Sequence, residues 1–315
     1  GVGSALITVI TMIAVPALGK LFLGNTEAAR EVERCGFQWF ALIIAVLFVI
    51  MIGITCLNIK EKSTVDLNAP SVKQMFRALV SNDQAMTVVI TIVLINCSLY
   101  ITSNLLLYFF KYDVSGESWY NSYTLFSTFG GAVQILSMMV LFPLLRKFMS
   151  SIRVFYLSFG MAIAGYAILL VLMIGGHTVI GALVVPGFLI FAAFGMLTVL
   201  TTVFLANTVD YGEMKNHRRD ESVIFSMQTF VVKLASGIAG FISSMVLFVF
   251  HISSNKEAVV TEPIAASSRM GLRLSMTIIP IVVLVIGFIV FKKRYILTDR
   301  KLTEISKELE KKHQN

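Results

Sequence analysis

Long apolar runs separated by short polar segments make up most of this chain. An α-helix needs about 20 apolar residues to cross the hydrocarbon core of a bilayer, and eight runs reach roughly that length. They cover residues 1–21, 37–57, 85–110, 120–145, 154–174, 179–209, 222–251 and 271–291. The pattern predicts an all-α, polytopic membrane protein with eight transmembrane helices.

The composition agrees with a membrane protein and argues against a soluble one. Hydrophobic residues make up 57% of the 315 residues and charged residues only 14%, and the mean hydropathy is +0.82. The formal net charge of +8 does not require a nucleic-acid partner, because basic residues of membrane proteins collect in cytoplasmic loops. We expect the lipid bilayer, and no nucleic acid, as a partner.

The apolar runs are unevenly grouped along the chain. Two precede a long polar segment, six follow it, and a charged tail ends the sequence. This layout is similar to a twelve-helix transporter of two six-helix halves without its first four helices, and we expect four more helices upstream. The predicted parts are the last two helices of an N-terminal bundle in 1–57, a cytoplasmic linker in 58–84, a C-terminal six-helix bundle in 85–291 and a cytoplasmic tail in 292–315.

Basic residues indicate the orientation. Most of the 26 Lys and Arg residues lie in the linker, the loops near Arg146 and Arg219, and the tail. The positive-inside rule therefore places these segments and the C-terminus in the cytoplasm. We expect the chain to cross the plasma membrane of the cell. In the tail, Leu302, Ile305 and Leu309 share one helical face, which allows a surface helix, although a solvated charged tail is favoured.

A single lysine lies deep in the seventh predicted span. From Ser222 to Asn255 the only charged residue is Lys233, which at about 1.5 Å per residue lies roughly 16 Å into the membrane, near its midplane. An ammonium group there is costly, so it should face protein or water. Small and polar residues recur with helical spacing around it, which predicts a cavity-lining helix. They are Ser226, Thr229, Ser236, Gly237, Gly240 and Ser244.

The segment TVDYGEMKNHRRDESVIFSMQTFVVK, residues 208–233, carries a family resemblance. Its acidic-Tyr-Gly-acidic run and the polar positions after it resemble the signature of the glycoside-pentoside-hexuronide cation symporters, the melibiose-carrier branch of the major facilitator superfamily. The matching residues are Asp210, Tyr211, Gly212, Glu213, Lys215, Arg219, Glu221, Ser222, Ser226, Gln228, Thr229 and Lys233. Weaker likeness, including Asn82-Asp83-Gln84, extends over the chain and corresponds to helices five to twelve of the family.

The resemblance implies a secondary transporter that takes up a sugar, glycoside or hexuronide with Na⁺ or H⁺ by alternating access. Lys233 would lie beside the sugar and cation sites, whose carboxylates belong to helices expected upstream, so no metal site is expected within this chain. No cofactor is expected, and the family acts as single units, which implies a monomer. Asp210 and Arg219 would form salt bridges of a cytoplasmic gate, together with Tyr211, Glu213 and Glu221.

Several of these residues can have a structural role in place of a role in transport. Gly212 is expected to permit a tight turn after a helix ending near Val209, and Lys215 is read as a solvated loop residue. Asn96 and Tyr100 lie in an unusually polar third span and could face substrate, as the family's seventh helix does, or bond neighbouring helices. Lys233 itself could be a structural lysine that holds helices together.

Other function classes remain open to different degrees. Thr198 stands where the melibiose carrier has a tryptophan near the sugar, which leaves room for another amphiphilic solute such as a lysolipid. An inactive truncated fragment is a further alternative. An enzyme is not expected, since no Gly-x-Ser-x-Gly turn, intramembrane carboxylate pair or His pair with metal-ligand spacing occurs in the spans.

Overall fold

The computed structural model describes residues 2–24, 29–58, 79–114, 119–216, 221–252 and 264–313. Within these ranges the regular structure is helical and no β-strand occurs, so the all-α expectation is confirmed there. Contacts between residues divide the chain into two compact units, Gly1–Ala69 and Pro70–Asn315.

The first unit contains two helices, α1 (Val2–Leu23) and α2 (Ala29–Asn58), which pack against each other. Their backbones approach closely at two glycines, since a Cβ atom on Gly19 or Gly36 would overlap a carbonyl group of the opposite helix. Only glycine permits such a crossing. The rings of Phe22 and Trp39 stack in the same unit, with their centroids 4.2 Å apart.

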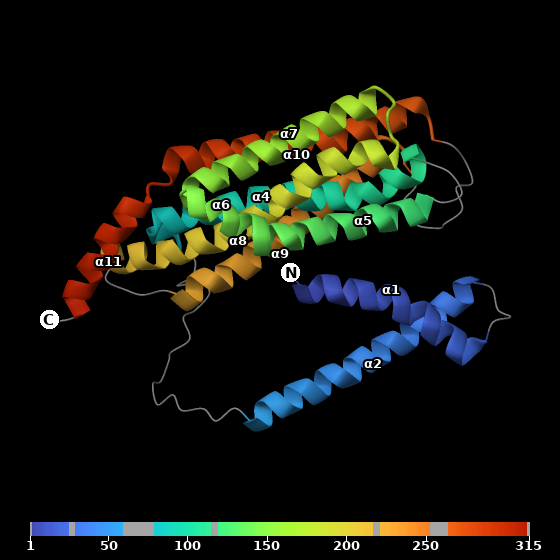
Figure 1. Ribbon diagram of the computed structural model, residues 1–315, viewed down its shortest axis with the longest axis horizontal. Coiled ribbons are helices and arrows are strands. Elements are labelled where there is room, and N and C mark those ends of the chain that lie inside the picture. The colour runs from blue at the N-terminus through green and yellow to red at the C-terminus, as the bar shows by residue number, and fades with distance from the viewer. Residues whose placement is uncertain are drawn as a thin grey trace. The chain divides into compact units, whose positions relative to one another are not determined.

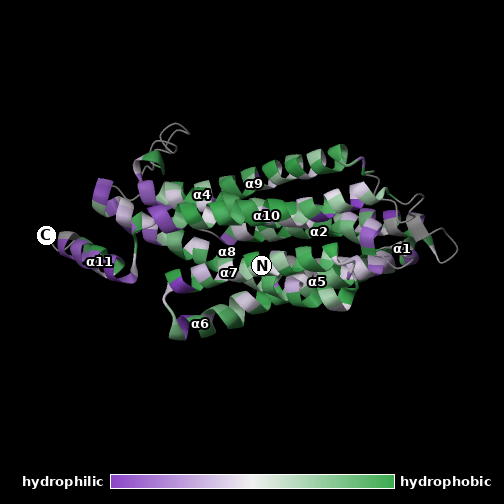
Figure 2. Ribbon diagram, turned by 90° about the horizontal axis from the view of Figure 1, so that it is seen from above, coloured by the Kyte–Doolittle hydropathy of each residue, from purple (hydrophilic) through white to green (hydrophobic). Residues whose placement is uncertain are grey.

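The second unit is a bundle of long helices that ends in a short one, α11 (Figure 1). Figure 2 shows hydrophobic residues along the helices and hydrophilic residues gathered toward their ends, as expected for a membrane bundle. The elements of the second unit are α4 (Asp83–Phe109), the π-helix η1 (Phe110–Val114), α5 (Trp119–Leu136), the π-helix η2 (Ser137–Leu141), α6 (Phe142–Phe148), α7 (Ser151–Ile174), α8 (Ile180–Asn216), α9 (Glu221–Val249), α10 (Ala266–Arg294) and α11 (Asp299–His313).

Helices α4 and α8 form the centre of this bundle. In each, 61% of the most apolar window is buried, compared with 33–39% in α7, α9 and α10. α4 packs against α8, α9 and α10, and α8 also packs against α5 and α7. The fully buried rings of Phe155, Phe204 and Phe291 join α7, α8 and α10. The core of the bundle therefore lies on α4 and α8.

Seven helices within the described residues are long and apolar enough to cross a membrane. They start at Arg34 in α2 and continue with α4, α5 to α6, α7, α8, α9 and α10, whereas in the first predicted span only Ile13–Leu23 is identified as a shorter apolar helix. The chain is thus a helical, multi-pass membrane protein. The exact count of eight stays a prediction.

Two local expectations are wrong. Helix α8 continues past Val209 to Asn216, so Gly212 lies inside a helix and makes no turn. The tail is not a solvated chain either, because residues 299–313 form α11, which contacts α8 and buries Ile305 and Leu309. In both places a charged sequence of low hydropathy is nevertheless helical.

Candidate functional site

Helix α9 presents three different faces. Its packed face contains the buried residues Val231, Ala235 and Ala239 and adjoins α4, where the Cys97 thiol donates to the carbonyl of Ala235 at 3.6 Å. The other two faces are exposed. One is a polar strip of Ser226, Thr229, Lys233, Ser236, Gly237 and Ser244; the other is an apolar strip of Phe230, Leu234, Ile238, Phe241, Met245 and Phe248.

The two exposed strips lie on different sides of α9. Successive residues of a helix are about 100° apart, which separates the polar strip from the apolar strip by roughly a quarter of a turn. The apolar strip is suited to lipid, whereas Lys233 in the polar strip would pay a large penalty there. Among the described residues Lys233 makes no ion pair or hydrogen bond that would neutralise it. The polar strip is therefore built to face water or polar groups.

Helices α7 and α10 provide a comparison. The exposed residues of α10 between Gly271 and Phe291 are all aliphatic, and those of α7 beyond Val154 are aliphatic or glycine. These faces can meet lipid tails at no cost. The polar strip of α9 thus differs from the outer faces of α7 and α10.

Helix α8 adjoins α9 through polar side chains. The Gln228 amide donates to the Thr202 hydroxyl at 2.9 Å, and the Thr202 hydroxyl donates to the carbonyl of Thr198 at 3.2 Å. Thr198 and Thr202 are both exposed, one turn apart on α8. The structure therefore brings the predicted residues Thr198 and Gln228 near each other through Thr202. Thr202 was not predicted as a site residue, although its spacing of four from Thr198 places both on one helical face.

The polar residues in the middle of α4 differ in whether they bond other helices. Ser98 donates to the carbonyl of Pro280 on α10 at 3.4 Å, and the Thr102 and Tyr166 hydroxyls are 2.6 Å apart. These two residues bond neighbouring helices, as the structural alternative expected. Asn96 and Tyr100 instead lie half-buried, one turn apart, and the Asn96 amide donates to its own helix at the Ile92 carbonyl.

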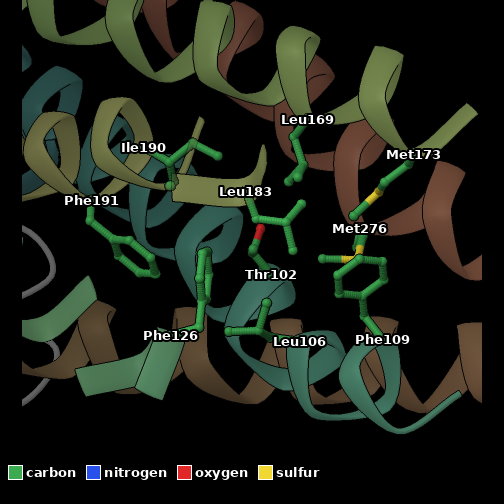
Figure 3. Close-up of a pocket in the computed structure, with 11 residues that line it drawn as sticks. Thr102, Leu106, Phe109, Phe126, Leu169, Met173, Leu183, Ile190, Phe191 and Met276 are labelled. Carbon is green, nitrogen blue, oxygen red and sulfur yellow. The ribbon is translucent and has the colours of Figure 1, made fainter. Parts of the chain in front are cut away.

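A small cavity inside the second unit does not suit a sugar. Its volume is about 20 Å³, close to the size that one water molecule needs. Figure 3 shows apolar side chains from α4, α5, α7, α8 and α10 around it, with the Thr102 hydroxyl as the only labelled polar group. That hydroxyl already bonds Tyr166. A polar solute must therefore bind elsewhere.

The start of α4 forms a polar junction with the end of α8. Asn82 caps α4 by accepting from the Ala85 amide at 3.0 Å, and its own amide donates to the carbonyl of Thr208 at 2.8 Å. Asp83 accepts from the Lys215 ammonium at 2.5 Å and from the Tyr211 hydroxyl at 3.2 Å. Lys215 is therefore an ion-pair partner and not merely a solvated loop residue.

Gly212 is needed at this junction for space. A Cβ atom there would lie 2.6 Å from the Asn82 amide nitrogen, which would displace the cap of α4. This close approach explains the glycine in place of the predicted turn. The segments Asn82–Gln84 and Tyr211–Gly212, which both resemble the family signature, therefore touch in the folded bundle.

The same junction reaches the end of α10. Gln84 accepts from the Ile296 amide at 3.0 Å and donates to the carbonyl of Arg294 at 3.2 Å. The adjacent Tyr295 is buried, and burial raises the pKa of its hydroxyl above the usual range. The Asn82–Gln84 segment thus joins α4, α8 and the connection to α11.

The other predicted gate residues lie on the end of α8 and the start of α9, and one of them is outside the described residues. Asp210 and Glu213 lie half-buried on the last turns of α8, and Glu221 is exposed at the start of α9. Arg219 lies outside the described residues, so its expected salt bridge with Asp210 stays a prediction. Tyr211 is buried, and its hydroxyl bonds Asp83.

A buried ion pair at the opposite end of α4 was not predicted. The Arg273 guanidinium donates from Nε to Asp113 Oδ2 at 2.6 Å and from Nη2 to Oδ1, and Nη1 donates to the Met173 carbonyl at 2.6 Å. The Asp113 side chain is 1% exposed. The pair joins η1, α7 and α10, and its partners are 160 residues apart.

The described residues offer no group of three or more His, Cys, Asp or Glu side chains that could hold a metal ion. Carboxylates are also absent from the middle of α9, where Lys233 lies. The middle of α9 therefore supplies no carboxylate beside Lys233.

Comparisons with known proteins agree with a transporter. A family model described as "MFS/sugar transport protein" matches residues 1–299. A lactose permease of Lactobacillus delbrueckii subsp. bulgaricus is 25% identical over 92% of this chain and 45% of its own length. A raffinose carrier protein of Pediococcus pentosaceus is 26% identical over 98% and 46%. An isoprimeverose transporter of Lactiplantibacillus pentosus is 27% identical over 76% and 48%.

These matches cover most of this chain but only part of each relative. The chain spans about half the length of the curated relatives it matches. All three relatives are named as transport proteins, which agrees with the expectation that the chain is not an enzyme.

Proposed function

Because the chain belongs to the MFS/sugar transport protein family, we propose that it carries a sugar, glycoside or hexuronide across a membrane by alternating access, together with Na⁺ or H⁺. The names of the relatives, which refer to lactose, raffinose and isoprimeverose, support a saccharide as the solute. The observation that carries the proposal is the polar strip on the exposed face of α9, with Lys233 near the middle of the helix.

The strip suits the recognition of a sugar. Its serines and Thr229 supply hydroxyl groups that donate and accept hydrogen bonds, and Thr198 extends this chemistry onto α8. Asn96 and Tyr100 on α4 are further candidates, since both remain half-buried and are not used between helices. A solute with many hydroxyl groups would replace the water that these side chains otherwise bind.

Lys233 gives the site a means of coupling. In a low-dielectric cavity an ammonium group is stabilised by a carboxylate, and the same carboxylate can bind Na⁺ or H⁺. We propose that such carboxylates, from outside the described residues, pair alternately with Lys233 and with the transported cation. Coupling follows if the cation and the sugar together stabilise one conformation more than either does alone.

The junction at the start of α4 is proposed as part of the cytoplasmic gate. It lies at the end of the bundle that carries Lys215, Arg294 and α11, which the positive-inside rule assigns to the cytoplasm together with the C-terminus. Asp210, Glu213 and Glu221 are near it on α8 and α9. Arg219 is proposed to complete the gate by pairing with Asp210.

Cysteine accessibility tests the orientation of α9. In a background in which Cys35, Cys56 and Cys97 are replaced, Ser236→Cys on the polar strip should react with a membrane-impermeant maleimide when the site is open. Phe241→Cys on the apolar strip is the matched control and should stay unreactive in lipid. Equal reactivity of the two positions, or reaction of the control alone, would contradict a water-facing polar strip.

Transport measurements test the role of Lys233. In the full-length protein reconstituted in vesicles, Lys233→Met should abolish accumulation of a labelled saccharide against its gradient, while Lys293→Met, at the end of α10, should leave it unchanged. A panel of galactosides, isoprimeverose, hexuronates and lysolipids identifies the solute class. Accumulation by the Lys233→Met protein at the normal level would refute the coupling role, and uptake of lysolipid alone would refute a sugar carrier.

A further inference from the structure

A shallow open groove of about 650 Å³ lies along α7. The residues that line the groove include Met149, Arg153, Gly160 and Ala164, which recur at helical spacing. Leu189 of α8 also lines it. The small side chains of Gly160 and Ala164 keep the groove open, since a Cβ atom on Gly160 would meet nothing within 4 Å. Its volume lies within the range of about 300–1,000 Å³ that is usual for bound small molecules.

The groove has the length of one lipid leaflet. Eleven residues separate Arg153 from Ala164, which corresponds to roughly 16 Å of helix. The hydrocarbon core of a bilayer is about 30 Å thick, so the groove runs from the polar end of α7 to about the membrane midplane. Apart from Arg153 and the Tyr156 hydroxyl, its lining carries no polar side chain. This shape suits a single acyl chain whose head group lies beside Arg153.

The polar end of the groove is strongly basic. Arg146, Lys147 and Arg153 lie within eight residues, all are exposed, and no Asp or Glu occurs between Trp119 and Val209. Arg146 also donates to the carbonyl of Met149, a groove residue, at 2.9 Å, which fixes one cation near the entrance. The N-terminus of α7 adds a partial positive charge at the same level. Arginine pairs well with phosphate oxygens.

We propose that this groove binds an anionic phospholipid, with one acyl chain along Gly160 and Ala164 and the phosphate beside Arg153. Basic sites next to transmembrane helices attract anionic head groups in the same way. A second copy of the chain is the competing occupant, because small residues four apart also favour helix pairing. Two copies joined in parallel at this groove would bring their cations together, which disfavours that arrangement.

Native mass spectrometry of the purified full chain tests the head-group contact. The detergent-solubilised protein is mixed with equal amounts of phosphatidylglycerol and phosphatidylcholine. Phosphatidylglycerol adducts should predominate, and Arg153→Gln should reduce them roughly fivefold, as expected for the loss of one membrane-surface cation contact. Lys293→Gln removes a cation at the end of α10 instead and should leave the adducts unchanged.

A second pair of variants tests the acyl-chain contact. Gly160→Leu fills the groove and should remove the adducts, whereas Ala167→Leu adds the same side chain at an exposed position of α7 outside it. A thermal midpoint near that of the unchanged protein shows that each variant is folded. The proposal is overturned if neither lipid is preferred, if Arg153→Gln and Lys293→Gln behave alike, or if the groove variants alter a dimer peak in place of lipid adducts.

Discussion

Replacing Asp113 with Asn should destabilise the bundle far more than breaking an exposed ion pair does. The substitution keeps the shape of the side chain but removes the negative charge that faces Arg273. The guanidinium is only partly exposed, with 15% of its side chain accessible, and donates two hydrogen bonds to Asp113. It would then remain in a largely buried site and face a neutral amide, which offers one acceptor oxygen and one NH2 donor in place of two carboxylate oxygens, beside the Met173 carbonyl.

The expected magnitude follows from this burial. Removing one partner of a buried ion pair costs about 3–5 kcal/mol, because the other charge is left without compensation. For a bundle of this size, each kcal/mol lowers the thermal midpoint by roughly 2–4 °C. We therefore expect Asp113→Asn to lower the midpoint by roughly 6–20 °C. The double variant Asp113→Leu with Arg273→Met removes both charges and should recover much of this loss.

The assay is thermal unfolding of the detergent-solubilised protein, followed by tryptophan fluorescence, for Asp113→Asn, for the two single variants Asp113→Leu and Arg273→Met, and for the double variant. Arg300→Met is the matched control, because Arg300 also pairs with an acid, Glu304, but is 91% exposed. That pair should contribute almost nothing. If Asp113→Asn lowered the midpoint no more than the control, or if the effects of the two single variants simply added, the buried pair would not act as described.

The remaining predictions concern the polar end of the bundle. Gly212→Ala should lower the thermal midpoint, because its Cβ atom would clash with the amide that caps α4, whereas Gly131→Ala, in open space on α5, should be neutral or slightly stabilising. Lys215→Met breaks a half-exposed pair and should change the unfolding free energy by less than about 1 kcal/mol in the same measurement. Ile305→Ser should release α11 and speed tryptic cleavage of the tail, and Glu308→Ala, on its exposed side, should not.

Hydropathy alone placed the membrane helices well. The predicted span 154–174 corresponds to α7 at Ser151–Ile174, and the span 222–251 corresponds to α9 at Glu221–Val249. A helix in a membrane must satisfy its backbone internally and present apolar side chains to lipid. Both requirements produce long apolar runs in a single sequence, so the positions of these helices could be predicted without any tertiary information.

The ends of the helices were less predictable, for a physical reason. Charged residues such as Glu213 and Lys215 mark where the hydrocarbon ends, but they are good helix formers and do not end the ladder of backbone hydrogen bonds. α8 therefore continues to Asn216. The role of Gly212 depends on Asn82, which is 130 residues away in the chain and touches it only in the folded bundle.

Long-range polar pairs were equally out of reach. Asp113 and Arg273 both lie near the ends of apolar runs, where a charged residue is ordinarily solvated. The π-helix η1 displaces the end of α4 from regular helical spacing, and no hydropathy signal predicts it. Only the packing of α4 against α10 brings the carboxylate to the guanidinium.

The candidate site depends on the same distinction between pattern and packing. Spacing alone shows that Ser226, Thr229 and Lys233 share a face of α9, but it cannot decide whether that face is packed or exposed. The buried residues Val231 and Ala235 answer this, since they direct the opposite side of the helix toward α4. With the polar face exposed and an apolar strip beside it, the boundary between lipid and a polar environment runs along α9 itself. A lysine at that boundary gains most from an acidic partner. The middle of α9 carries no carboxylate, so the proposed coupling requires one from outside this helix.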